Sequence, residues 1–274
     1  MLGNLSRRVC VKAIKTRPVC VLTNQIRSYA GEEQPKTAEV NKAPKQRRAA
    51  FILSGCGTLD GSDPVEAVSL MIACGQNKVD NAYFTVYNKE IEDCFLHTTR
   101  EIDPKEERIT QKESARIIRA APQNLERLDA SQYDLLVIPG GNGNVRTLLT
   151  LEQHLDELDE VVIDAKVKQT IQAFHQAKKP IVASSNAVVL LSKALEGSQL
   201  ALSVGKFTDK PLVDYVENTT GKPVEVSDAT QPKVDRENAI VTLASTNAVS
   251  NVNFNEIFDG AREAIKSAIG LLKQ

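Results

Sequence analysis

The stretch from Lys179 to Leu195, KPIVASSNAVVLLSKAL, constrains the fold more than any other part of the chain. Residues 181–183 form a short apolar run typical of a buried strand, and residues 187–195 repeat apolar side chains at helical spacing. The strand must therefore pass into a helix within residues 184–186, which we call the elbow. A turn this sharp holds one side chain above the sheet, beside the unpaired N–H groups that begin the helix. The pattern predicts an α/β fold and puts Ser185 where α/β enzymes carry a nucleophile.

Other apolar runs extend this pattern into a sheet, and two of them are followed by glycine-rich loops, SGCG at 54–57 and GGNG at 140–143. The carboxyl ends of parallel strands share one edge of an open sheet, and that edge is where such sheets bind ligands. We therefore predict one doubly wound domain over residues 48–274, with a mostly parallel sheet and helices on both faces. The predicted strands are 48–53, 82–87, 133–139, 181–183, 200–204 and 239–244, with 224–226 as an edge strand.

Two helices have clear sequence signals. Asp63 is a suitable N-cap and Pro64 a suitable first residue for a helix that ends at Gly75 and turns Val68 and Ile72 inward. A long amphipathic helix over 254–272 is predicted to point Phe254, Ile257 and Ile265 towards the sheet. Residues 88–131 are weakly patterned, and there we predict a hairpin or other excursion followed by a short helix at 113–119.

The first 29 residues contain six Lys or Arg and no Asp or Glu, the composition of a mitochondrial transit peptide. Without these charges the formal net charge of −1 becomes −7, which argues against a nucleic-acid or anionic-membrane partner. Residues 30–47 are polar and predicted to be a linker or an extended N-terminal arm. No run approaches eighteen apolar residues, so no membrane span is expected. The predicted location is the mitochondrial matrix.

Three motifs resemble one family: SGCGTLDGSDPVEA, IPGGNG and FHQAKKPIVASSNAVV. Together they are similar to the PfpI superfamily of class I glutamine-amidotransferase-like domains, and most of all to its mitochondrial branch and the bacterial ElbB glyoxalase-like proteins. The resemblance covers Arg48 to Leu272. It implies a flavodoxin-like fold and self-association into a homodimer.

The resemblance also implies roles for individual residues. The family carries a cysteine at the elbow in a pattern like C-x-A-P, and a glutamate of the first helix hydrogen-bonds to it. Ser185 falls on the cysteine, Glu66 on the glutamate and Gly141 on an oxyanion-hole glycine, while Gly140 and Asn186 complete the ligand-binding positions. The chain departs from the family at the nucleophile, at Lys206 where some members have histidine, and at 243–245 in place of TPA. These departures indicate a vestigial site in a retained scaffold.

Chemistry at Ser185 would require an activating base, because a hydroxyl is a weak nucleophile at its own pKa. Three histidines, Glu66 and Lys206 are candidates, yet none of the histidines follows a predicted strand. Cys56, at the exit of the first strand, is the candidate for a relocated thiol, and its alternative role is to pack a tight turn. The histidines are His97, His154 and His175.

Two functions therefore remain open. The first is a catalytically inactive subunit that binds a small anionic metabolite, self-associates or joins a larger mitochondrial assembly. The second is a cofactor-free glyoxalase- or deglycase-like enzyme, or a hydrolase, that uses Ser185 or Cys56. The cysteines that follow the transit peptide, Cys56, Cys74 and Cys94, lack metal-ligand spacing, so we predict neither a metal nor a cofactor.

Overall fold

The computed structural model describes residues 46–154, 157–205, 210–244 and 253–272. The predicted transit peptide (1–29) lies outside these residues, as do most of the predicted linker (30–47), Lys206 and Ser245. The account that follows concerns the described residues alone.

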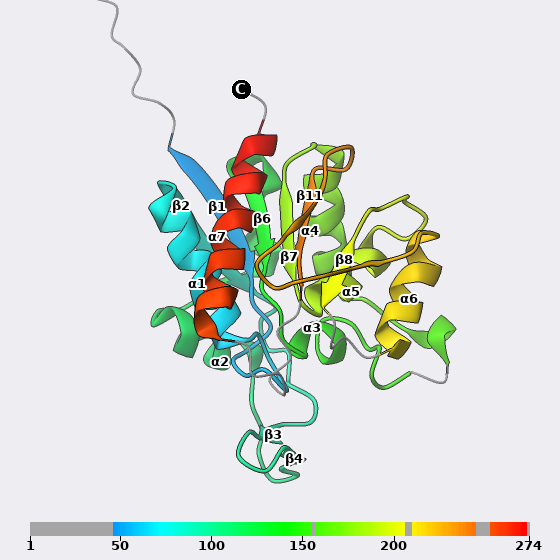
Figure 1. Ribbon diagram of the computed structural model, residues 1–274. Helices are drawn as coiled ribbons and strands as arrows, with labels where there is room; N and C mark the ends of the chain where they lie inside the picture. The colour runs from blue at the N-terminus through cyan, green and yellow to red at the C-terminus, as the bar shows by residue number, and fades with distance from the viewer. Residues whose placement is uncertain (1–45, 155–156, 206–209, 245–252, 273–274) are drawn as a thin grey trace, which may run out of the picture. The chain divides into compact units, whose positions relative to one another are not determined.

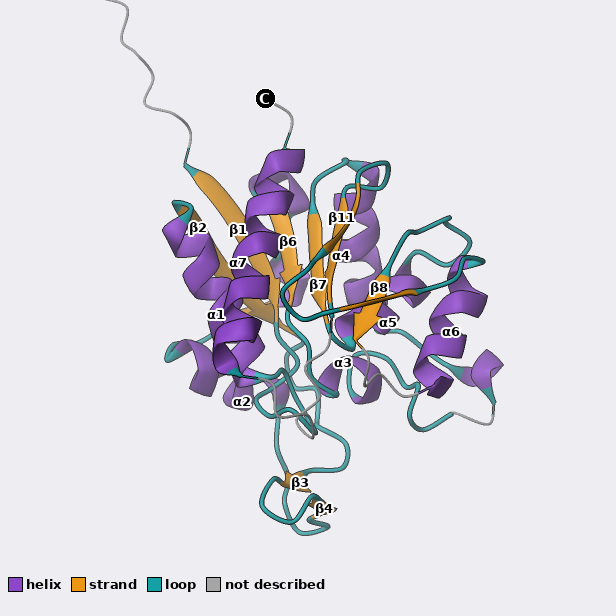
Figure 2. Cartoon of the chain, viewed as in Figure 1, coloured by secondary structure: helices purple, strands orange, loops and turns teal. Residues whose placement is uncertain are grey.

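A seven-stranded sheet forms the centre of the fold (Figures 1 and 2). Its strands are β1 Arg47–Ile52, β2 Val79–Thr85, β5 Gln123–Asn124, β6 Leu135–Ile138, β7 Ile181–Ser184, β10 Lys233–Asp235 and β11 Ile240–Leu243. They lie in the order β10-β11-β7-β6-β1-β2-β5, and every neighbouring pair is parallel except β10 with β11. The predicted doubly wound, mostly parallel sheet is confirmed.

Helices cover both faces of this sheet, as predicted (Figure 2). One apolar cluster joins α1 and α7 to one face, and a second joins α4, α5 and α6 to the other. The helices are α1 Pro64–Gln76, α2 Thr110–Ile118, α3 Gly143–Arg146, α4 Ala165–Gln176, α5 Ala187–Ala194, α6 Lys210–Thr220 and α7 Phe254–Leu271, with single 3-10 turns at Leu125–Arg127, Ala130–Gln132 and Leu158–Glu160.

The strands separate the two clusters by their two-residue alternation. In β1, Phe51 packs with the α1 and α7 side, while Ile52 packs with the α4 and α5 side. In β7, Val182 belongs to the first cluster and Ala183 to the second. Each strand is apolar on both faces because each face is covered, which is why these segments are unbroken apolar runs in the sequence.

The predicted inward faces of two helices are wrong at several positions. In α1, Val68 and Ile72 are 40% and 47% exposed, and the smaller Ala67 and Ala73 are buried instead. Small side chains let α1 lie close to α7 and the sheet, so apolar content alone misassigns the face. Phe254 at the start of α7 is 69% exposed. The α1 helix also continues past Gly75, which lies within it.

Two short strands of the carboxyl-terminal half form a separate sheet. β8 Ser203–Gly205 and β9 Glu225–Ser227 pair with each other in parallel. The run at 200–204 therefore does not extend the main sheet as expected. The antiparallel edge of the main sheet is β10, a strand of only three residues that the sequence analysis did not predict.

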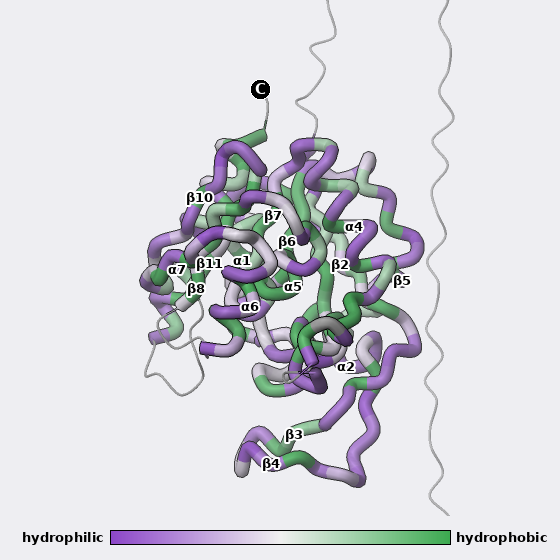
Figure 3. Tube along the Cα trace, turned by 90° about the vertical axis from the view of Figure 1, so that its right-hand side faces the viewer, coloured by the Kyte–Doolittle hydropathy of each residue, from purple (hydrophilic) through white to green (hydrophobic). Residues whose placement is uncertain are grey.

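Residues 88–109, which we call the arm, extend beyond the carboxyl ends of the central strands (Figures 1 and 3). The arm contains a small antiparallel pair, β3 Phe95–Leu96 with β4 Glu101–Ile102, which agrees with the predicted hairpin. It returns to the main body through a bridge between Glu90 and Ile109, just before α2 begins. The arm thus lies at the same edge of the sheet as the elbow.

None of the described helices is long and apolar enough to cross a membrane.

Candidate functional site

The elbow forms as predicted: β7 ends at Ser184 and α5 begins at Ala187. Ser185 adopts a left-handed backbone with φ of 54°, a conformation that residues with a side chain rarely adopt. Its N–H donates to the Leu243 carbonyl at 3.0 Å, and its carbonyl accepts from Val188 N–H at 3.1 Å. Ser185 is therefore fixed between the end of the sheet and the first turn of α5.

Glu66 lies in the first turn of α1, is 4% exposed and reaches the elbow. Its Oε2 accepts hydrogen bonds from Ser184 Oγ at 2.6 Å and from Gly140 N–H at 3.1 Å. The Gly140 N–H also points to Ser184 Oγ at 2.9 Å, so three groups meet at one point. The resemblance placed Glu66 against Ser185, but the hydroxyl that hydrogen-bonds to Glu66 is that of Ser184.

Burial, together with the nearby carboxylate of Asp63, raises the pKa of Glu66 to about 8. The hydrogen bonds from Ser184 and Gly140 act in the opposite direction, because both stabilise the carboxylate. Glu66 is thus mostly protonated at neutral pH. In its protonated form the carboxyl cannot accept the proton of a serine hydroxyl, and only the minor ionised form of Glu66 could act as a base.

Two loops support the site: the first loop, residues 54–63, and the glycine loop, residues 140–143. They are held together by hydrogen bonds from Asp63 N–H to Gly140 O at 2.8 Å, from Gly143 N–H to Gly61 O at 3.0 Å and from Asn142 N–H to Thr58 O at 2.9 Å. Asn186 joins the same group through its Nδ2, which donates to Asn142 Oδ1 at 2.7 Å. The structure thus brings the predicted residues Glu66, Gly140, Gly141, Ser185 and Asn186 together at one edge of the sheet.

Some backbone N–H groups of the site donate hydrogen bonds within the protein, and others do not. Those of Gly140 and Ser185 are used within the protein, as described above. Within the described residues, no hydrogen bond engages the N–H of Gly141, Asn186 or Ala187. Asn186 and Ala187 begin α5, where the helix dipole favours a negative charge. Gly141, Asn186 and Ala187 are therefore the backbone donors of this site that have no partner among the described residues.

Two of the histidines, His97 and His175, form contacts away from the elbow. His97 Nε2 accepts from Leu59 N–H at 3.4 Å, and its Nδ1 faces the Phe95 carbonyl at 3.3 Å. His175 Nε2 lies 3.2 Å from Asn238 Oδ1 at the opposite end of β11 from the elbow. Neither arrangement leaves a ring nitrogen aimed at the elbow.

The cysteines of the described residues are poor nucleophiles. Burial raises the pKa of the Cys56 thiol, and the carboxylate of Glu113 raises it further. Burial also raises the pKa of Cys94, and that of Cys74 to about 12. A thiol reacts as its thiolate, so these shifts make Cys56 less reactive than a free cysteine. Among the described residues, no group of histidine, cysteine and acidic side chains is arranged to hold a metal ion.

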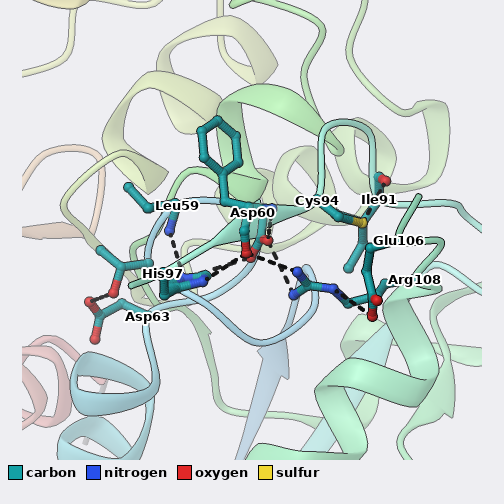
Figure 4. Close-up of polar contacts among 10 residues, drawn as sticks. Leu59, Asp60, Asp63, Ile91, Cys94, His97, Glu106 and Arg108 are labelled. Atoms are coloured by element: carbon teal, nitrogen blue, oxygen red, sulfur yellow. Dashed lines mark hydrogen bonds and ion pairs between the residues drawn. The ribbon is translucent and has the colours of Figure 1, made fainter. Parts of the chain in front are cut away.

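A buried carboxylate, Asp60, ties the first loop to the arm (Figure 4). Its Oδ2 accepts from Phe95 N–H at 2.7 Å and pairs with Arg108 Nη1 at 3.2 Å. His97 lies on the other side, with Nε2 3.9 Å from Asp60 Oδ1. The sequence analysis did not identify this cluster, because its members are far apart in the chain and come from a weakly patterned segment.

Asp63 gives a direct test of how α1 is held in place. Its Oδ1 accepts from the N–H groups of Val65 and Glu66 at 2.8 and 3.0 Å, and its Oδ2 accepts from Thr58 Oγ1 at 2.8 Å. We expect Asp63→Ala to lower the free energy of unfolding by about 1–2 kcal/mol, as measured by urea denaturation. Asp63→Asn keeps a capping oxygen and should lose less than half of that. Equal losses in the two variants would show that the cap contributes nothing.

No protein-family model matches the chain. A rat protein named ES1 protein homolog, mitochondrial, is 30% identical over 239 residues, which cover 84% of this chain and 86% of the rat protein. The chain belongs to the ES1 family. A second ES1-family relative, the human glutamine amidotransferase-like class 1 domain-containing protein 3, mitochondrial, is 27% identical over 231 residues, 82% of this chain and 83% of the human protein.

Solved structures agree with this assignment. An Ehrlichia chaffeensis isoprenoid biosynthesis protein with an amidotransferase-like domain aligns with a TM-score of 0.70 and 26% identity, covering 82% of this chain and all of that one. The Francisella tularensis Rapid Encystment Protein, with a TM-score of 0.51 and 14% identity, shares the fold. The human relative and the Ehrlichia chaffeensis structure are both named for an amidotransferase-like domain, which agrees with the resemblance that the motifs indicated.

Proposed function

We propose that this ES1-family protein is catalytically inactive at the elbow and uses the site to bind a small anion. One observation carries the proposal: the carboxyl of Glu66 is buried and hydrogen-bonded to Ser184, and its pKa is raised to about 8, first of all by burial. A protonated Glu66 cannot activate a serine, but it puts no negative charge beside an incoming anion. The unengaged N–H groups of Gly141, Asn186 and Ala187 are the donors for that anion.

The proposed setting is the mitochondrial matrix, where the protein works as a binding or structural subunit. The names of the rat and human relatives place those proteins in mitochondria, and the basic, acid-free first 29 residues support the same location here. Self-association, or incorporation into a larger mitochondrial assembly, is the corresponding proposal for partners.

The second candidate, a glyoxalase- or deglycase-like enzyme or a hydrolase, is favoured by one observation. Ser185 is held in a strained backbone conformation at a turn from strand to helix, and strain of this kind is concentrated at functional sites. The raised pKa of Cys56 argues against the version of this candidate that uses a thiol.

Turnover of methylglyoxal separates the two candidates. We expect the wild type, Ser185→Ala and Cys56→Ala to consume methylglyoxal at the rate of buffer alone. Ser185→Cys should raise the rate at least about tenfold, because a thiol beside a helix N-terminus has a lowered pKa and needs no base. Turnover by the wild type that disappears in Ser185→Ala or Cys56→Ala would overturn the proposal and identify the nucleophile.

Anion binding is tested separately by titrating pyruvate into the 15N-labelled protein. The amide resonances of Gly141, Asn186 and Ala187 should shift with a saturable dependence on pyruvate, and titration with uncharged acetone should leave them in place. Shifts that are absent, or equal for the two compounds, would contradict an anion site at the elbow.

A further inference from the structure

A cavity lies away from the elbow, where the base of the arm meets α2. Its volume is about 430 Å³, within the range of cavities that hold small molecules. The segments that carry Glu90 and Ile109 pair across it as an isolated bridge, and α2 supplies the remaining wall. None of the elbow residues lines this cavity.

The α2 wall presents two cations to the cavity. Lys112 and Arg116 are four residues apart, and positions at this spacing lie one above the other on the same side of a helix. Among the described residues, Arg116 forms one ion pair, from its Nε to Glu113 Oε1 at 3.2 Å. Its two terminal nitrogens, together with the Lys112 ammonium, match the two oxygens of a carboxylate.

A third cation at the cavity, Arg108, is already neutralised. Its Nη1 pairs with the buried Asp60 at 3.2 Å, and its Nη2 donates to the Phe95 carbonyl at 3.0 Å (Figure 4). Arg108 therefore belongs to the cluster that holds the arm in place. Within the described residues Lys112 forms no ion pair, and Arg116, although its Nε pairs with Glu113, keeps its two terminal nitrogens for a ligand.

The extended segments that face α2 carry negative charge. Glu90 and Glu107 both line the cavity, and within the described residues neither forms an ion pair. Two isoleucines, Ile91 and Ile109, contribute apolar surface between the charged groups, and Ile91 is 5% exposed. The remaining lining residues, Glu106 and Glu113, are paired with Arg108 and Arg116. The lining thus combines charges of both signs with a short apolar stretch, and within the described residues Lys112, Glu90 and Glu107 form no ion pair.

We propose that this cavity binds a small aliphatic zwitterion, such as an α-amino acid with an unbranched hydrocarbon side chain. The carboxylate is held by Lys112 and Arg116, the ammonium by Glu90 and Glu107, and the hydrocarbon chain by Ile91 and Ile109. A purely anionic ligand would leave the two glutamates opposed to it, and a purely cationic one would meet the same conflict at Lys112 and Arg116. The site is independent of the elbow and of the function proposed for it.

The test uses three compounds that share one hydrocarbon chain. L-Norleucine carries both charges, hexanoate lacks the ammonium, and pentylamine lacks the carboxylate. Each is titrated into the full-length 15N-labelled protein, and the dissociation constant is read from the amide shifts of Ile109 and Lys112. We expect norleucine to saturate these shifts and each single-charge analogue to bind at least about tenfold more weakly, the loss expected for one charged contact.

Substitutions then locate the site. Lys112→Gln, Arg116→Gln and Glu90→Gln should each weaken norleucine binding at least about tenfold. Lys266→Gln, at an exposed lysine of α7 outside the cavity, is the matched control and should bind norleucine as the wild type does. Circular dichroism and thermal melting check that every variant is folded.

Several outcomes overturn the proposal. If norleucine does not saturate the amide shifts of Ile109 and Lys112, the cavity does not bind it and the proposal is wrong. Hexanoate that binds as tightly as norleucine makes the cavity an anion site, and pentylamine that does so makes it an amine site. Norleucine binding that is unchanged by Lys112→Gln and Arg116→Gln shows that the ligand lies elsewhere. None of these results depends on whether the elbow binds pyruvate or turns over methylglyoxal.

Discussion

Gly141→Ala should destabilise the protein by about 4 kcal/mol in the free energy of unfolding. Gly141 has φ of 106°, a backbone conformation that alanine adopts only under strain. An added Cβ would also lie 2.2 Å from Gly61 O and 2.5 Å from Asp63 N. Both obstacles are backbone atoms of the first loop, so no side-chain rotation can relieve them.

The first loop cannot simply move away. It is joined to the glycine loop by Asp63 N–H to Gly140 O and by Gly143 N–H to Gly61 O, and separating the loops breaks these buried bonds. Displacing the glycine loop should also disturb the elbow, because the Gly140 N–H donates to Glu66 and Ser184. Urea denaturation followed by circular dichroism measures the loss of stability.

Gly75→Ala is the matched control. Gly75 lies inside α1, and no atom comes within 4 Å of the position of an added Cβ. Alanine is the better helix former, so this variant should be more stable than the wild type by up to about 1 kcal/mol. If Gly141→Ala changes stability by less than about 1 kcal/mol, the close approach of the two loops at this point is wrong.

Much of the architecture could be predicted because it depends on local patterns. The turn from β7 into α5, the cap at Asp63 and the buried strand β6 each follow from side chains adjacent in sequence. The elbow and the glycine loop then had to meet, since parallel strands bring their carboxyl ends to one edge.

The partner of Glu66 was missed, although the sequence contained the signal. Side chains alternate along a strand, and Val182 of β7 packs on the side of α1. Ser184, two residues later, points to that same side and meets Glu66, whereas Ser185 lies beyond the strand in a left-handed turn. Applying the two-residue period to the end of β7 would have paired Glu66 with Ser184.

Other features could not be predicted, because they depend on packing between distant segments. The inward face of α1 is set by how closely α7 approaches, and this favours Ala67 and Ala73 over the larger Val68 and Ile72. The contact of Asp60 with Arg108 joins residues 48 positions apart, and no periodicity links them. Strand β10 has only three residues, too few for an alternation to be visible.

The contribution of Glu66 to stability should fall as the pH rises. The pKa of Glu66 is about 8 in the folded protein, against 4.5 for an ordinary glutamate. Between these values the folded state binds a proton that the unfolded state has lost. The stabilisation from this group is therefore complete below about pH 4.5 and is lost progressively until the pH passes about 8.

Comparison with Glu66→Gln isolates this effect from the rest of the titrating groups. Glutamine stays neutral, and its side-chain oxygen can accept the same hydrogen bonds from Ser184 and Gly140. Between about pH 5 and about pH 9, the wild type should lose about 4 kcal/mol relative to Glu66→Gln in urea denaturation. The variant should be the more stable protein at the alkaline end. Parallel pH profiles for the two proteins would contradict a protonated Glu66.

The stabilisation from Glu66 is lost over a range of pH, and two neighbours of Glu66 set the upper end of this window. Substituting these neighbours should move the upper end in opposite directions. Asp63→Asn keeps a capping oxygen but removes the negative charge that raises the pKa of Glu66, so the loss of stability should be complete at a lower pH than in the wild type. Ser184→Ala removes a hydroxyl that donates to the carboxylate, so the window should extend to higher pH. A window that is unchanged in both variants would mean that burial alone keeps Glu66 protonated. Opposite shifts would show that the first loop and the elbow together set its charge, and with it the affinity of the site for an anion.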